Sequence, residues 1–306
     1  MTMPPPPAAA FAPVFSGRHL RAALHPGAGN HDLLMVTFDF RRVNRKGFSE
    51  ANFSSVFARL GHAQLSITSR CNDWFINDDT EALERALAPV AARFGRVHAM
   101  GYSMGGYGAF RFARALGLRR AVAISPQATI APGAVPGDRR YAAEARGFDP
   151  VLGDLAGRGD PGLEGLILVD PFLRADLAHA RLITRAFPGV RILPLPFAGH
   201  PASGVIGEAG RIWLLQRAAS AGGNDAAIRA AHRAARRDSG HYWTQLARAA
   251  ARRHPLRAAQ AAEQARLCAA RSAAARAAAR AEQEENTRRN AARRAGAPSG
   301  RLPGDG

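Results

Sequence analysis

A serine, an aspartate and a histidine follow one another in this chain at positions suited to nucleophilic catalysis. Ser103 is the centre of Gly101-Tyr-Ser-Met-Gly105, Asp170 ends an apolar run, and His200 comes 30 residues after Asp170 in a glycine-containing loop. A serine hydroxyl is a weak nucleophile unless a histidine takes its proton and a carboxylate orients that histidine. The set therefore predicts acyl transfer through a covalent acyl-enzyme.

The segments beside Ser103 predict a sharp turn from a strand into a helix. Residues 97–100 are apolar and favour a strand, and residues 109–116 favour a helix that Gly117 ends. A serine in so tight a turn takes a strained backbone conformation and exposes its hydroxyl, and the helix start offers N–H groups to an oxyanion. The plainer alternative is a serine that only caps the helix, which this strand–turn–helix context disfavours.

The acid and the base each have competitors. We prefer Asp170 as the acid, because Asp176 stands where the following helix would need an N-cap; Asp176 is the alternative acid. We prefer His200 as the base, because it lies in a loop after the last predicted strand. His98 falls on a predicted core strand and His179 on a predicted helix, which favours packing roles for both.

Strands and helices alternate along most of the chain. This rhythm predicts an α/β fold with a doubly wound, mostly parallel sheet, whose functional groups gather at the carboxyl ends of the strands. Residues 125–162, rich in Pro, Gly and charge, are expected to leave the sheet as a cap or insertion over the active face. Strands are expected at 11–15, 19–24, 33–38, 63–68, 97–102, 121–124, 163–169 and 191–197, and helices at 49–60, 79–94, 109–116, 176–187 and 205–218.

Residues 11–218 resemble the α/β-hydrolase superfamily, and carboxylesterase-like serine hydrolases in particular. The resemblance implies Ser103 as the nucleophile, Asp170 as the acid and His200 as the base, with no cofactor and no metal. It rests on the segments Gly101-Tyr-Ser-Met-Gly105, Val169-Asp170-Pro171 and Phe197-Ala-Gly-His200, and on the extension of the elbow to Ala109.

The same resemblance implies an oxyanion hole made of two backbone amides. One is the amide of Met104, directly after the nucleophile, and the other is expected from Asp39 or Phe40. Many members of the superfamily carry His-Gly or a glycine run there, whereas residues 37–40 of this chain are Thr-Phe-Asp-Phe, which narrows the acyl site. The candidates for lining the substrate pocket are Tyr102, Trp74 and Phe75, of which the last two would serve equally as lid or core aromatics.

Composition divides the chain into a globular part and a basic extension. The formal net charge is +18, and residues 221–306 hold 17 arginines against seven acidic residues. We expect a disordered segment at 1–10, a hydrolase domain at 11–220, an Ala/Arg-rich helical extension at 221–281 and a disordered tail at 282–306. The two cysteines are far apart, and the sequence shows neither a secretory signal nor a membrane span, which favours the cytoplasm.

The basic extension raises the question of partners. Clustered arginines neutralise phosphates, but they alternate with no aromatic residues in a nucleic-acid-binding pattern, and arginine-rich helices usually present a solvated face. We therefore disfavour specific nucleic-acid binding and leave the C-terminal helices as a surface for a protein partner.

The sequence as a whole predicts a serine hydrolase that cleaves an ester-type acyl bond of a small molecule. Two alternatives stay open. One is an acyltransferase that uses the same triad, and the other is a non-catalytic binding or assembly protein that acts through its basic helices.

Overall fold

A computed structural model of the protein describes residues 11–29 and 32–295. The chain divides into two compact units, Met1–Arg237 and Asp238–Gly306. Of the segments expected to be disordered, 1–10 and residues 296–306 of the tail 282–306 lie outside the described residues, whereas residues 282–295 are helical.

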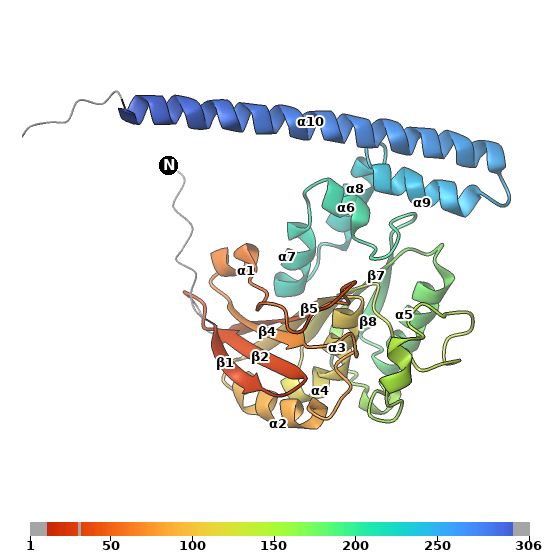
Figure 1. The fold of residues 1–306 in the computed structure, drawn as a ribbon. Coiled ribbons are helices and arrows are strands. Elements are labelled where there is room, and N and C mark those ends of the chain that lie inside the picture. Colours follow the sequence, from red (N-terminus) through yellow and green to blue (C-terminus); the bar gives the residue numbers. More distant parts are fainter. Residues whose placement is uncertain (1–10, 30–31, 296–306) are drawn as a thin grey trace, which may run out of the picture. The chain divides into compact units, whose positions relative to one another are not determined.

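An eight-stranded sheet forms the centre of the first unit's described part, in the order β1-β2-β4-β3-β5-β6-β7-β8 (Figure 1). The pairs β1–β2 and β2–β4 are antiparallel, and every later pair from β3–β4 to β7–β8 is parallel. The predicted α/β class and mostly parallel sheet are therefore confirmed. The strands are β1 Ala12–Ser16, β2 Leu20–His25, β3 Leu33–Phe38, β4 Ala63–Ser69, β5 Arg96–Tyr102, β6 Arg120–Ile124, β7 Glu164–Val169 and β8 Val190–Pro194.

Helices cover both faces of the sheet and bury a separate core on each. One core packs α2, α3, α4 and α5 against the sheet, and the other packs α1, α6, α7 and α8. Strand β3 is buried along its whole length, as a strand covered on both faces requires. The helices are α1 Ser55–Arg59, α2 Thr80–Ala91, α3 Met104–Arg111, α4 Ala113–Leu116, α5 Arg174–Ala186, α6 Gly204–Glu208, α7 Trp213–Ala221, α8 Asp225–Ala235, α9 Gly240–Ala250 and α10 Pro255–Ala295, with short 3₁₀ turns at Glu144–Gly147 and Ala156–Arg158.

The helix expected at 109–116 is observed as α3 and α4, which begin at Met104 and Ala113. Two further differences come from local capping and turn residues. The helix expected at 49–60 begins only at Ser55, since Ser54 accepts a hydrogen bond from the amide of Phe57 as an N-cap does. The helix expected at 205–218 divides into α6 and α7, and Gly210 between them has a φ of 66°. A left-handed glycine ends the first helix there.

The expected boundary of the hydrolase domain at residue 220 is wrong. Helix α8 belongs to the first unit, which ends at Arg237. Ile228 of α8 is fully buried in the core that α6 and α7 share, and the His232 ring contacts the carbonyl oxygen of Pro196 at 3.0 Å. Composition did not distinguish this helix from the extension, because α8 is itself rich in alanine and arginine.

Replacing Ile228 by alanine is expected to lower the free energy of unfolding of the first unit by about 2–5 kcal/mol, because a fully buried side chain leaves a cavity. Val43→Ala is the matched control, since Val43 is 78% exposed. Chemical denaturation of both variants measures the difference. If Ile228→Ala unfolds like Val43→Ala, helix α8 is not an integral part of the first unit.

The second unit consists of α9 and α10 in its described part. The two helices pack against each other, with Ala261 and Cys268 buried. Helix α10 continues to Ala295, past the boundary expected at residue 281. Its exposed Arg289–Glu285 pair is an i, i+4 contact of the kind that prolongs a polar helix. Within the described ranges, no helix has the length and apolarity to cross a membrane.

Candidate active site

Ser103 lies at the turn between β5 and α3 in the strained conformation that the motif predicts. Its φ of 50° and ψ of −115° are rare for a residue with a side chain, and its amide donates to the carbonyl oxygen of Ile124 at 2.8 Å. The first glycine of the motif, Gly101, has no room for a side chain, because an added Cβ would overlap the backbone of Gly105. The turn therefore needs glycine for close packing and presents the serine at the carboxyl end of β5.

Gly105 allows the start of α3 to approach the end of β3. A Cβ added there would lie 2.7 Å from the carbonyl oxygens of both Phe38 and Asp39. Gly105→Ala is expected to lower the free energy of unfolding by about 1–3 kcal/mol, because this clash with the backbone outweighs alanine's helix preference of about 1 kcal/mol. Gly147→Ala, where a Cβ would meet nothing within 4 Å, is the control in the same thermal or chemical melt. Equal stabilities of the two variants would contradict this packing.

A chain of hydrogen bonds joins Ser103, His200 and Asp176. The Ser103 Oγ lies 3.1 Å from His200 Nε2, and His200 Nδ1 lies 2.7 Å from Asp176 Oδ2. Ser103 follows β5, His200 follows β8 and Asp176 lies in the first turn of α5, which follows β7. The three residues follow parallel strands of one sheet, whose carboxyl ends meet at one edge.

In the structure the carboxylate that contacts His200 is Asp176, the alternative acid, and not the preferred Asp170. Helix α5 begins at Arg174 with Leu173 as its N-cap, so Asp176 is not needed as a cap and its fully buried side chain reaches His200. Asp170 instead accepts hydrogen bonds from the backbone amides of Phe172, Phe197 and Gly199, at 3.0, 3.1 and 2.9 Å.

These bonds give Asp170 a different place in the site. Two of its three donors, Phe197 and Gly199, belong to the loop that carries His200. Asp170 therefore fixes the backbone of that loop without touching the histidine ring.

Asp176 has a second partner that sequence reasoning did not identify. Arg140 Nη1 donates to Asp176 Oδ1 at 2.6 Å, while Arg140 Nη2 donates to Asp138 Oδ2 at 2.6 Å. Burial would raise the pKa of Asp176, but the hydrogen bond and charge of His200 and the charge of Arg140 outweigh it and lower that pKa. The carboxylate is therefore ionised at neutral pH, as a group that orients a histidine must be.

Neither expected second oxyanion donor has an unused amide. The amide of Asp39 donates to Ile67 in the sheet at 2.9 Å, and the amide of Phe40 donates to the Asp39 carboxylate at 3.0 Å. The Asp39 side chain is itself held by Arg45 at 2.6 Å and by Ser49 at 3.1 Å. This carboxylate is therefore a structural anchor of the loop after β3.

The amide of Met104 keeps the place expected for the first oxyanion donor. Met104 is the first residue of α3, and the first amides of an α-helix have no intrahelical acceptor. The positive end of the helix dipole lies at the same point.

Residues of the 125–162 segment complete the surroundings of Ser103. Gln127 is fully buried, and its Oε1 accepts from the Ser103 hydroxyl at 3.1 Å and from the indole N–H of Trp74 at 3.2 Å. The Tyr141 hydroxyl lies 3.5 Å from His200 Nε2. Sequence reasoning missed both residues. The position of Gln127 just beyond β6 was a usable signal, whereas nothing local distinguishes Tyr141.

The three candidates for the substrate pocket have different surroundings. Trp74 is buried, and its ring packs against Tyr141 with 4.7 Å between ring centroids. It therefore holds the Tyr141 ring in place. Phe75 is a core aromatic that packs edge-on against Phe38. Tyr102 ends β5, is partly buried, and burial raises its pKa to about 12.

The two rival histidines have packing roles, as expected from their predicted elements. The buried ring of His98 contacts the carbonyl oxygens of Ala219 and Ser220 at 3.0 and 3.1 Å. His179 on α5 lies 3.0 Å from Asp138 and accepts a hydrogen bond from the amide of Ala128.

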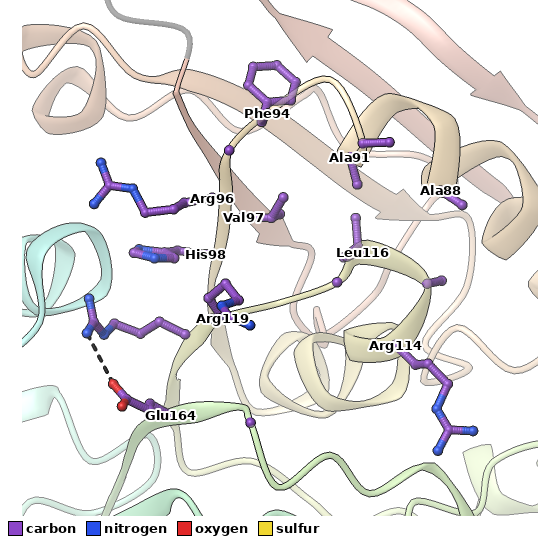
Figure 2. A pocket seen from close by; sticks show the side chains of 16 residues that line it. Ala88, Ala91, Phe94, Arg96, Val97, His98, Arg114, Leu116, Arg119 and Glu164 are labelled. Atoms are coloured by element: carbon purple, nitrogen blue, oxygen red, sulfur yellow. Dashed lines mark hydrogen bonds and ion pairs between the residues drawn. The ribbon is translucent and has the colours of Figure 1, made fainter.

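A hollow of about 740 Å³ lies elsewhere, around the amino ends of β5 and β6. Figure 2 shows Arg96 and His98 pointing to one side of the strand and Arg114 pointing the other way, so these basic groups do not converge on one ligand. Arg96 is paired with Asp32 at 2.8 Å, and burial, followed by the charge of Arg120, lowers the pKa of His98 to about 4. This hollow contains no paired nucleophile and base.

The sheet order, with its antiparallel first two pairs, and the strained serine turn after β5 define the α/β-hydrolase fold. The fold predicted from the sequence is therefore present, and Ser103 lies at the turn that follows β5. At the carboxyl edge of the sheet a serine, a histidine and a carboxylate form a connected set.

Comparison with known proteins found structural likenesses at low sequence identity. No protein-family model matches the chain, and no curated protein matches it. Similar solved structures include the capsule O-acetyltransferase of Neisseria meningitidis serogroup A (12% identity, TM-score 0.45, covering 61% of this chain and 86% of that one). A thermostable carboxylesterase from a metagenomic library (15%, TM-score 0.47, 74% and 90%) and a putative thioesterase from Silicibacter sp. (15%, TM-score 0.46, 72% and 84%) are similar in the same way. Likenesses this distant transfer neither a reaction nor a substrate.

Proposed function

We propose that the protein is a serine hydrolase that cleaves an ester-type acyl bond of a small molecule through an acyl-enzyme. The observation that supports the proposal is the hydrogen-bond chain from Ser103 through His200 to Asp176, with links of 3.1 and 2.7 Å. In this proposal Ser103 is the nucleophile, His200 the base and Asp176 the acid that orients it.

Acylation begins when the Ser103 oxygen attacks the substrate's carbonyl carbon. His200 Nε2 takes the serine proton as the carbon–oxygen bond forms, and the carbonyl oxygen becomes an oxyanion beside the Met104 amide. The tetrahedral intermediate then collapses. The bond to the leaving group breaks, and His200 returns the proton to the leaving oxygen, which leaves the acyl group on Ser103.

Deacylation repeats these steps with water as the nucleophile. His200 takes a proton from the water as its oxygen attacks the acyl carbon, and the bond to Ser103 Oγ breaks as the proton passes to that oxygen. Asp176 accepts a hydrogen bond from His200 Nδ1–H throughout, which leaves Nε2 unprotonated in the resting state. An alcohol in place of the water would make the same site an acyltransferase.

The proposal is tested by incubating the full chain with a fluorophosphonate probe and measuring the intact mass. A single adduct that maps to Ser103, together with turnover of p-nitrophenyl acetate, is the expected result. An intact, folded protein that takes no label and turns over no acyl ester would overturn the proposal. It would leave a non-catalytic role, for which the basic C-terminal helices remain the candidate surface.

A further inference from the structure

The phenol of Tyr141 occupies an unusual position in the site. Its oxygen lies 3.5 Å from His200 Nε2, the nitrogen that also faces Ser103 Oγ at 3.1 Å. In a serine hydrolase the leaving-group oxygen must come within reach of this nitrogen to receive its proton, and the deacylating water must come within the same reach to lose one. Tyr141 is therefore adjacent to the place that these two oxygens occupy in turn.

Several contacts hold the Tyr141 ring in this place. One face packs against the buried Trp74, with 4.7 Å between centroids. The guanidinium carbons of Arg140 and Arg41 lie 5.4 and 5.8 Å from the ring centroid. Arg41 is in turn paired with Glu144 at 2.6 Å. A side chain fixed by neighbours that are themselves paired needs little reorganisation during the reaction.

The protonation state of Tyr141 suits a hydrogen-bonding role. Burial raises the pKa of its hydroxyl, and the opposing effects of Arg140 and of a hydrogen bond with Ser103 are smaller. The phenol is thus neutral at physiological pH, with one proton to donate and lone pairs to accept. It can donate to a departing alkoxide oxygen and accept the second proton of an attacking water.

We propose that Tyr141 is a further catalytic residue, whose hydroxyl binds and orients the oxygen that leaves in acylation and the oxygen that attacks in deacylation. The inference rests on the proposed function. It assigns to the 125–162 segment a direct part in the chemistry and makes Tyr141 the residue that positions the acyl acceptor, whether water or an alcohol. The phenol keeps its proton through the cycle, and His200 carries the transferred one.

Tyr141→Phe tests the inference through the two half-reactions. With p-nitrophenyl acetate the leaving group departs without protonation, so acylation of Tyr141→Phe is expected to proceed within about threefold of the wild-type rate. Deacylation is expected to slow by about 10- to 100-fold, because the attacking water loses one of its two partners. Acetyl-Ser103 should therefore accumulate in the variant, as measured by quenched flow and intact mass. With an ethyl ester, whose leaving oxygen needs a proton, acylation should slow as well.

Tyr107→Phe is the matched control. The buried hydroxyl of Tyr107 donates to the carbonyl oxygen of Gly153 at 2.8 Å, so this variant loses a phenol that contacts the same 125–162 segment and touches no triad residue. It is expected to lower the melting temperature and leave the ratio of the two half-reactions unchanged.

The outcomes separate the competing roles. Equal slowing of both half-reactions with p-nitrophenyl acetate would indicate that Tyr141 contacts the oxyanion, which would overturn the inference. Deacylation of Tyr141→Phe at the wild-type rate would also overturn it. A drop in acylation with no accumulated acyl-enzyme would show a merely structural role, which also overturns it. If the wild-type protein itself forms no acyl-enzyme, the proposed function fails, which is a different result from any of these.

Discussion

Replacing Ser103 by alanine is expected to abolish fluorophosphonate labelling and to lower kcat/KM for p-nitrophenyl acetate by at least about 10⁴-fold. Loss of the nucleophile in a serine hydrolase removes the covalent route altogether, and what remains comes from binding and from oxyanion stabilisation alone. The strained φ of 50° at Ser103 is imposed by the turn and stays in the variant, so we expect the protein to remain folded. Steady-state kinetics and the intact mass after labelling measure the effect.

Ser220→Ala is the control for Ser103→Ala. Ser220 is also a largely buried serine, but it lies on α7, and its hydroxyl donates only to the carbonyl oxygen of Arg217 at 3.3 Å. It should label and turn over substrate like the wild type. Undiminished turnover by Ser103→Ala would show that the reaction does not pass through this serine.

Replacing Asp176 by asparagine is expected to lower kcat by about 10⁴-fold with little change in binding. An asparagine amide can donate to His200 Nδ1, which would place the ring proton on Nε2. A protonated Nε2 cannot accept the proton of Ser103. Because the lowered pKa of Asp176 keeps the wild-type carboxylate ionised, the deficit should be nearly constant from about pH 5 to pH 8. A pH–rate profile of both proteins measures it.

Asp170→Asn separates the two candidate acids. The new side chain still offers one oxygen to the amides of Phe172 and Phe197 but loses the acceptor for the amide of Gly199. We expect a loss of about 1–3 kcal/mol in the free energy of unfolding and a far smaller change in kcat than for Asp176→Asn. A kcat that falls more in Asp170→Asn than in Asp176→Asn would restore Asp170 as the acid.

The part of the site that could be predicted depends on local chain geometry. A serine between two glycines, preceded by an apolar run and followed by a helix-forming segment, predicted the turn at Ser103, because backbone sterics over a few residues decide it. The same holds for the position of His200 after the last strand. The alternation of strands and helices likewise predicted the confirmed α/β sheet.

The choice between Asp170 and Asp176 could not be made from local signals. Both aspartates follow β7. Helix α5 begins at Arg174, two residues before its expected start, and this shift decides which carboxylate faces the histidine. The oxyanion loop was misjudged for a related reason. Whether the amide of Asp39 is available depends on its pairing with Ile67 in β4, a strand that begins 24 residues later in the sequence.

The amino-acid sequence alone thus determines the turn at Ser103, the strand ends that carry the polar residues and the basic character of the C-terminal helices, since each depends on neighbouring residues. Only the tertiary structure brings Ser103, Asp176 and Tyr141 to His200, and Gln127 to Ser103. These contacts join segments 24 to 97 residues apart in the chain. They form because the parallel sheet brings the carboxyl ends of β5, β6, β7 and β8 to one edge and because the 125–162 segment packs over that edge.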